Sequence, residues 1–147
     1  MQVELRWKEL MAFEAKAGAN TVSMDAKSPI GKGSAQTPKE LMIAGLCGCT
    51  AMDVIGLMRK YRQEVTSFKI DADVSVQEKG HPAVFTAVKL NFYLEGTIEA
   101  AKAVEAVRLS QTQYCGVSAM LVKAFPISWE VFVNGESVGT GEAAFSN

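Results

Sequence analysis

Three thiols are the side chains of this sequence best suited to chemistry: Cys47, Cys49 and Cys115. A thiol becomes a nucleophile when it loses its proton, and its surroundings decide how readily it does so. Many free cysteines are instead small buried hydrophobic residues, and this structural alternative applies to each of the three. Cys49 follows Gly48, so little side-chain bulk shields its sulfur on that side. Cys49 is therefore a candidate for contact with a substrate.

Cys115 is expected at the start of a helix that spans about 115–124. Unpaired N–H groups and the helix dipole at such a position favour a thiolate and lower the pKa of the thiol. Cys47 and Cys49 lie roughly 200° apart around a helix, so they cannot easily pair and make a poor metal motif. His81 is the only histidine and falls in an expected hairpin loop, where it is interpreted as a solvated turn residue. We therefore expect no metal site.

The helix that carries Cys49 has the clearest start signal in the sequence. The segment Thr37-Pro38-Lys39-Glu40 supplies an N-cap hydroxyl, a proline at the first helical position and a glutamate at the third. These residues form a capping box and predict a helix at 38–61, roughly 35 Å long. Gly45 and Gly48 lie inside it and favour close packing by another element.

Strands and further helices are expected around this long helix, because apolar residues alternate in several segments. The expected elements, in chain order, are strands within 2–25 with turns near Glu9 and at 17–20, the helix at 38–61, a hairpin of strands at 68–76 and 84–94, a helix at 98–111 capped by Thr97, the helix at 115–124, a strand at 127–133, and a tail that either adds a short strand at 142–145 or frays. Strands and helices are largely segregated, which favours an α+β fold.

Composition limits the possible classes of protein. The chain has 147 residues, of which 48% are hydrophobic, and this length fits one domain over 1–147. Its 15 basic and 16 acidic residues are dispersed, so no nucleic-acid partner is expected. The apolar stretch 41–58 contains Asp53 and is interpreted as a buried helix, with no membrane partner. An odd number of cysteines without a signal peptide favours reduced or cycling thiols in the cytoplasm.

Two motifs resemble those of the OsmC/Ohr superfamily. Residues 37–41 and 48–52 are similar to its Pro-x-Glu-Leu helix start, followed eleven residues after the proline by a helical cysteine. Residues 114–118 (YCGVS) resemble its second cysteine motif. The resemblance covers nearly the whole chain and is closer to the uncharacterised OsmC-like branches than to Ohr proper. It implies an OsmC-like α+β fold of antiparallel sheets around a long central helix, in an intertwined homodimer.

The resemblance also implies a reaction. Cys49 would be the peroxidatic thiol and Cys115 the resolving thiol of a peroxidase that reduces organic or inorganic hydroperoxides under oxidative or osmotic stress. Such an enzyme needs no cofactor, only an external thiol reductant such as a dithiol. Glu40 is a further catalytic candidate, although its role in the capping box is an equally good interpretation.

The sequence departs from the Ohr pattern in charged positions. The turn at 17–20 lacks the arginine that stabilises the thiolate in Ohr, and Arg6 or Arg108 would have to replace it. Lys39 stands where Ohr has its glutamate. Asp53 is expected on the same helix face as Cys49, where an ionised carboxylate would disfavour the thiolate.

These departures keep an alternative function open. The chain would then be a non-enzymatic OsmC-like protein that binds small molecules or thiols, with cysteines that react without turning over.

Overall fold

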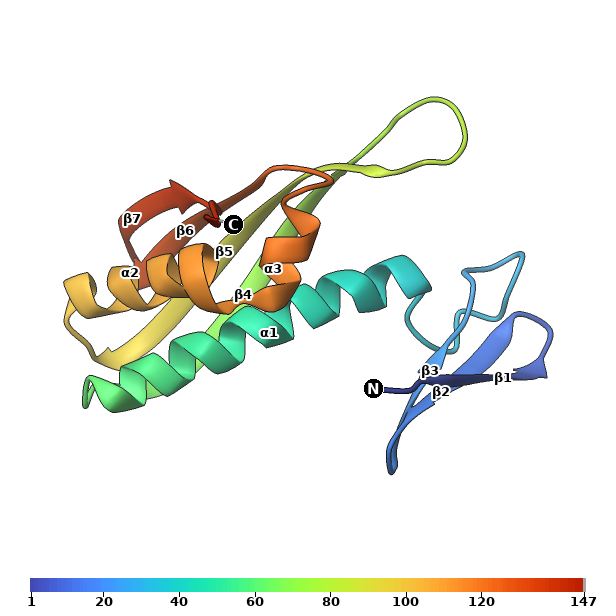
Figure 1. The fold of residues 1–147 in the computed structure, drawn as a ribbon, viewed down its shortest axis with the longest axis horizontal. Coiled ribbons are helices and arrows are strands. Elements are labelled where there is room, and N and C mark those ends of the chain that lie inside the picture. Colours follow the sequence, from blue (N-terminus) through green and yellow to red (C-terminus); the bar gives the residue numbers. More distant parts are fainter. Residues whose placement is uncertain (147) are drawn as a thin grey trace. The chain divides into compact units, whose positions relative to one another are not determined.

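The computed structural model describes residues 1–146 (Figure 1). Its elements in chain order are β1 (Glu4–Glu9), β2 (Ala12–Ala17), β3 (Asn20–Met24), α1 (Pro38–Lys60), β4 (Glu64–Val76), β5 (Phe85–Thr97), α2 (Ala100–Leu109), the π-helical turn η1 (Ser110–Tyr114), α3 (Gly116–Leu121), β6 (Ile127–Val133) and β7 (Glu136–Glu142). The chain divides into two compact units, Met1–Ala44 and Gly45–Asn147, so α1 begins in one and continues in the other. The predicted α+β class is confirmed.

The Met1–Ala44 unit contains an antiparallel sheet of β1, β2 and β3, as the alternation predicted. Cross-strand neighbours share a face of a sheet, and here the two faces differ in polarity. Leu5 pairs with Ala15, which pairs with Val22. The same register aligns Trp7 with Phe13. One face is therefore apolar, and its leucine and tryptophan are 56% and 67% exposed.

Asp25 organises the loop between β3 and α1. Its carboxylate accepts hydrogen bonds from the backbone N–H groups of Ala26 (2.8 Å), Lys32 (3.2 Å) and Ser34 (3.0 Å). The hydroxyl of Ser34 donates a further bond of 2.8 Å. The Ser34 bonds are the main reason why the pKa of Asp25 lies below its usual range. A Cβ at Gly31 would collide with the Ala26 carbonyl, so the loop needs glycine there.

Helix α1 begins with the predicted capping box. The Thr37 N–H donates to Glu40 Oε2 at 2.8 Å, and the Glu40 N–H donates to Thr37 Oγ1 at 3.3 Å. Lys27 Nζ lies 2.7 Å from Glu40 Oε1 and, with the Thr37 bonds, lowers the pKa of Glu40 to about 2. The observed helix, Pro38–Lys60, confirms the predicted one within one residue.

The part of α1 in the second unit has a fully buried stripe at one residue per turn: Leu46, Thr50, Val54 and Met58. This spacing is that of a helix packed along one face. By length and composition alone α1 could cross a membrane, and it is the one helix among residues 1–146 that passes this test. Buried stripes of this kind are also typical of core helices.

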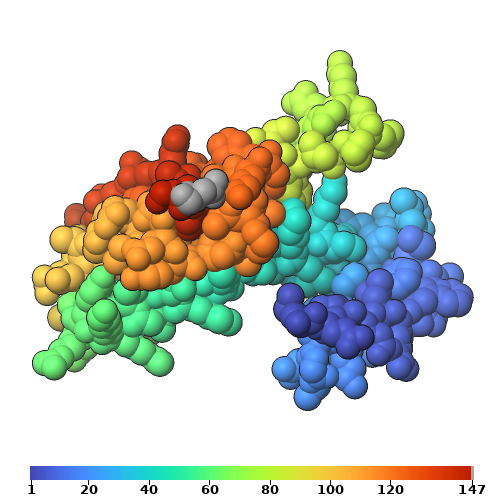
Figure 2. Space-filling view, viewed as in Figure 1, coloured from blue at the N-terminus to red at the C-terminus, as the bar shows by residue number. Residues whose placement is uncertain are grey.

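The Gly45–Asn147 unit contains a sheet in the order β4-β5-β6-β7. Its core face carries the buried side chains of alternating residues on β5 and β6, and α2 lies on this face (Figure 1). The sheet is not purely antiparallel, because β5 and β6 run parallel. A parallel pair needs a crossover, and α2, η1 and α3 form it. The β4–β5 hairpin projects from the unit and carries His81, which is exposed (Figure 2).

Several predicted boundaries differ from the structure. Thr97 does not cap a helix, because it still pairs with Glu64 in the β4–β5 ladder, and α2 starts after Glu99. The predicted helix at 98–111 is shorter, since η1 replaces its last turn. The final strand is β7, Glu136–Glu142, and not 142–145.

Candidate active site

Two of the three thiols meet in the Gly45–Asn147 unit. The sulfurs of Cys49 and Cys115 and a carboxylate oxygen of Asp53 all lie within 4.8 Å of one another. Helix α1 supplies Cys49 and Asp53 one turn apart, so the prediction that they share a helix face agrees with this geometry. Both are half-buried, whereas Cys115 is fully buried. Both thiols are free.

The turn η1 determines where Cys115 lies. A π-helical turn holds one residue more than an α-helical turn, and such turns are frequent at functional sites. The Cys115 N–H donates to the Ser110 carbonyl at 2.9 Å and closes this wider turn. Cys115 itself is extended (φ −70°, ψ 100°) and is the N-cap of α3. The predicted helix at 115–124 is therefore shortened to Gly116–Leu121.

The surroundings of Cys115 favour the neutral thiol. Burial is the main cause that raises its pKa, to about 11, and the neighbouring Cys49 adds to the effect. Ser118 opposes it, because its N–H and hydroxyl donate to Cys115 Sγ at 3.3 and 3.2 Å. The prediction that a helix start lowers this pKa is thus wrong. Loss of hydration at a buried sulfur outweighs two hydrogen bonds and the dipole of a six-residue helix.

A chain of buried polar side chains leads to Asp53. Gln111 Nε2 donates to Thr50 Oγ1 at 2.9 Å, and Thr50 Oγ1 lies 2.7 Å from Ser110 Oγ. Ser110 Oγ in turn donates to Asp53 Oδ2 at 2.9 Å. All these bonds can point towards the carboxylate, with Thr50 as donor to Ser110. Within residues 1–146, Gln111 Oε1 is a buried atom without a hydrogen-bond partner.

Sequence reasoning missed Thr50, Ser110 and Gln111. Their signal is weak: Ser110-Gln111-Thr112 is a polar run after an apolar helix, and such a run by itself indicates only a break. Ser110 and Gln111 are buried because η1 turns both side chains into the core, against Thr50.

Cys47 is outside this cluster, as its position on the helix predicted. It is half-buried, and burial raises its pKa, with a smaller contribution from the negative charge of Asp71. Its surroundings therefore also favour the neutral thiol.

The other predicted site residues have local partners. Glu40 belongs to the Met1–Ala44 unit, where it closes the capping box and pairs with Lys27. Its catalytic role stays a prediction. Arg6 pairs with Glu4, and Arg108 pairs with Glu105 at 2.7 Å. Each arginine that was a candidate for stabilising the thiolate thus has a carboxylate beside it.

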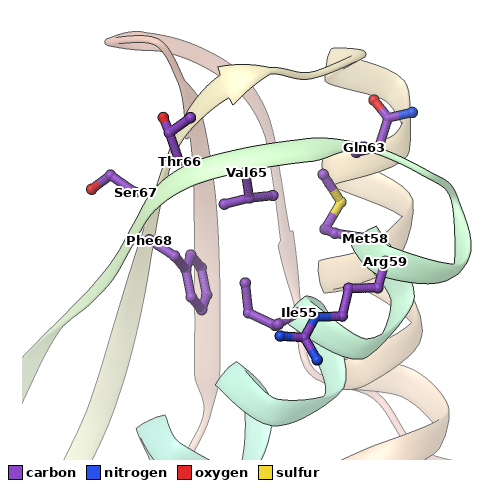
Figure 3. A pocket seen from close by; sticks show the side chains of 8 residues that line it. All are labelled: Ile55, Met58, Arg59, Gln63, Val65, Thr66, Ser67 and Phe68. Carbon is purple, nitrogen blue, oxygen red and sulfur yellow. The ribbon is translucent and has the colours of Figure 1, made fainter.

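A hollow of about 250 Å³ lies between the end of α1 and the start of β4. The side chains of Ile55, Met58 and Arg59 face those of Val65 and Phe68 across it (Figure 3). None of Cys49, Asp53 and Cys115 lines this hollow, so it is separate from the thiol cluster.

The chain is thus an α+β protein in which one cysteine of a close pair lies on a long helix and the other lies in the crossover between two parallel strands. A family model described as OsmC-like protein matches residues 31–130, and the chain belongs to this family. The resemblance found in the sequence is thereby confirmed.

Relatives agree with this assignment. Protein YhfA of Escherichia coli K12 is 33% identical over 135 residues, which cover 89% of this chain and 98% of YhfA. The crystal structure of a hypothetical protein from Aquifex aeolicus is 30% identical, with a TM-score of 0.76 over 90% of this chain and 96% of the other. An organic hydroperoxide resistance protein OsmC from Legionella pneumophila shares the fold, with 17% identity and a TM-score of 0.65 over 88% of this chain and 94% of the other.

Proposed function

We propose that this protein is a thiol-dependent peroxidase of the cytoplasm that reduces organic or inorganic hydroperoxides. The observation that carries the proposal is the facing pair of thiols, with Cys49 half-buried and Cys115 fully buried within 4.8 Å of it. Membership of the OsmC-like family supports a role in oxidative or osmotic stress. The Legionella pneumophila protein of the same fold is named for resistance to organic hydroperoxides.

The proposed reaction has three steps. The Cys49 thiolate attacks a peroxide oxygen, the O–O bond breaks, and an alcohol or water leaves as Cys49 becomes a sulfenic acid. Cys115 then attacks the oxidised sulfur, and water leaves as the disulfide forms. An external dithiol reduces this disulfide by thiol exchange and restores both thiols.

The unequal burial of the two thiols supports this division of roles. Because the pKa of Cys115 is about 11, Cys115 is protonated at neutral pH and is a poor first nucleophile. Cys49 is the more accessible sulfur. The carboxylate of Asp53 disfavours a negative charge beside it, so we expect modest activity that Asp53→Asn increases near neutral pH.

Peroxide consumption with dithiothreitol tests the proposal. We expect Cys49→Ser to abolish turnover and Cys115→Ser to allow only poorly sustained turnover, because no disulfide can form. Cys47→Ser is the matched control and keeps the wild-type rate, since Cys47 lies outside the cluster. After mild peroxide, peptide mapping should link Cys49 to Cys115. Equal, slow consumption by wild type and Cys49→Ser would instead favour the non-enzymatic OsmC-like binding protein.

We also propose a homodimer. Met52 on α1 is 79% exposed. Apart from chain neighbours and the nearby backbone of α1 itself, no atom of residues 45–146 lies within 4 Å of a Cβ built at Gly45, Gly48 or Gly56. The predicted close packing at Gly45 and Gly48 is therefore not found within residues 45–146. A second copy would cover this apolar surface.

Sedimentation analysis tests the homodimer. Wild type should sediment as a dimer at micromolar concentration, and Met52→Glu should weaken the association at least tenfold. Gln77→Glu, at an exposed position in the β4–β5 hairpin, adds the same single negative charge and is the control. A wild-type monomer at that concentration would contradict the proposal.

A further inference from the structure

Three side chains, two from α1 and one from the crossover between β5 and β6, converge as potential metal ligands. Cys49, Asp53 and Cys115 offer two sulfurs and one carboxylate oxygen within 4.8 Å of one another. Ligands of a tetrahedral zinc ion, at roughly 2.3 Å for sulfur and 2.0–2.2 Å for oxygen, lie about 3.4–3.8 Å apart. Small side-chain rotations would therefore bring all three donors onto one ion. We propose that this cluster binds a thiophilic divalent cation, Zn²⁺ in the first place.

The charge of the cluster favours a cation. Within residues 1–146, Asp53 takes part in none of the salt bridges, whose acidic partners are other carboxylates. A divalent ion would supply the positive charge next to Asp53 and both sulfurs. Each thiol that binds it releases one proton, so two thiols, the Asp53 carboxylate and one Zn²⁺ give a complex of net charge −1 and two protons.

An outer layer of hydrogen bonds already orients the ligands. Ser110 Oγ donates to Asp53 Oδ2 and fixes the orientation of this carboxylate. The N–H and hydroxyl of Ser118 both donate to Cys115 Sγ and hold its sulfur on the side of Cys49. Such second-layer partners fix the geometry of metal ligands, and their loss typically costs 10–100-fold in affinity.

The types of ligand select the ion. Two thiolates and one carboxylate suit Zn²⁺, whereas Mg²⁺ and Ca²⁺ prefer sites made only of oxygen. Three protein ligands leave a fourth position for water or an external thiol, as in zinc sites that are not purely structural. Neither Cys47 nor His81 belongs to the cluster, so neither fills that position.

Binding and oxidation exclude each other at this site. The metal needs both sulfurs as thiolates, and the Cys49–Cys115 disulfide removes both. Bound Zn²⁺ would therefore shield Cys49 from peroxide, and oxidation would release the ion. The inference goes beyond the proposed peroxidase activity, because a chain without that activity can still bind the ion.

Titration of the reduced protein without oxygen tests the site. Co²⁺ reports thiolate ligation by a charge-transfer absorption in the near ultraviolet, and Zn²⁺ affinity follows from competition with a chromogenic chelator. We expect one ion per chain, loss of the absorption in Cys49→Ser and in Cys115→Ser, and a decrease in affinity of at least tenfold in Asp53→Asn. Cys47→Ser should bind like wild type. Wild-type protein oxidised to the disulfide should not bind, and its reduction should restore binding, which excludes misfolding as the cause.

Two outcomes would overturn the site: a wild-type chain that gives no charge-transfer absorption, or an Asp53→Asn variant with unchanged affinity. Asp53→Asn also separates the two proposals, because it should weaken metal binding while it accelerates peroxide reduction. Activity without metal binding refutes the site alone, and metal binding without activity refutes the peroxidase alone.

Discussion

The two compact units of the chain are organised by different forces. In Gly45–Asn147, the buried side chains of β5 and β6 form a continuous hydrophobic core with α2. In Met1–Ala44, the one buried residue among those described is Asp25, a carboxylate held by four hydrogen bonds. One unit is thus stabilised by removing apolar surface from water, and the other by local polar contacts.

This difference indicates what each unit needs in order to be stable. A segment of 44 residues is close to the length below which chains rarely form a sufficient core. Its sheet nevertheless presents Leu5 and Trp7 on an exposed apolar face. Covering that face would stabilise the unit, which agrees with the proposed homodimer.

The largest effect should come from the core of the second unit. Phe92 is fully buried, so Phe92→Ala should lower the free energy of unfolding by about 3–5 kcal/mol. Leu5→Ala removes apolar atoms that are 56% exposed, and at monomeric concentrations it should cost less than about 0.5 kcal/mol. Urea unfolding followed by fluorescence measures both. Similar losses in the two variants would show that the first unit has a core of its own.

An intermediate effect is expected from substitution of the buried polar residues in the second unit. Thr50→Val keeps the shape of the side chain but leaves Ser110 and Gln111 without their shared partner. The free energy of unfolding should fall by about 1–3 kcal/mol, the usual cost of an unpaired buried polar group. Thr50→Ser keeps the hydroxyl and should recover part of this loss. A Thr50→Val variant as stable as wild type would mean that the polar chain contributes nothing to stability.

The smallest effect should come from the loop of the first unit. Asp25→Asn should accelerate amide exchange at Lys32 and Ser34, because the amide accepts fewer of the hydrogen bonds. In wild type, the folded state lowers the pKa of Asp25. Its stabilising contribution is therefore present above the unfolded pKa of about 3.9 and is lost as the pH falls through the lower folded value.

Amide exchange measured against pH checks this sign. Glu9→Gln is the control, since Glu9 pairs with Lys32 only through an exposed salt bridge. If Asp25→Asn does not change the exchange rate at Ser34, Asp25 does not organise the loop.

The parts of the fold that were predictable are those with local causes. The capping box at Thr37 and Glu40 involves residues three positions apart, and α1 starts where it predicts. The β6–β7 hairpin follows from Asn134-Gly135, both of which adopt positive φ. The predicted start of α2 was wrong because Thr97 belongs to β5, where it pairs with a residue of β4 more than thirty positions away.

In the candidate active site, too, only the residues with a local sequence motif were predictable. The two cysteine motifs indicated Cys49 and Cys115, which the structure brings together. The polar residues around them were missed, because Ser110 and Gln111 form a buried hydrogen-bonded chain only through Thr50, which lies some sixty positions earlier. The pKa of Cys115 depends on burial, which the helix-start argument did not include.

The direction in which Cys115 points depends on the number of residues in the π-helical turn η1. Removing one residue from Ser110–Tyr114 would let this turn close as an ordinary α-helical one, which changes the direction of Cys115 by only a small angle. Adding a residue to a segment that already holds an extra one would instead rotate the chain from Cys115 onwards by roughly 100° relative to α2. An insertion at the exposed Gln113 should therefore turn Cys115 away from Cys49 and damage the site more than a deletion there, although every side chain of the cluster is retained.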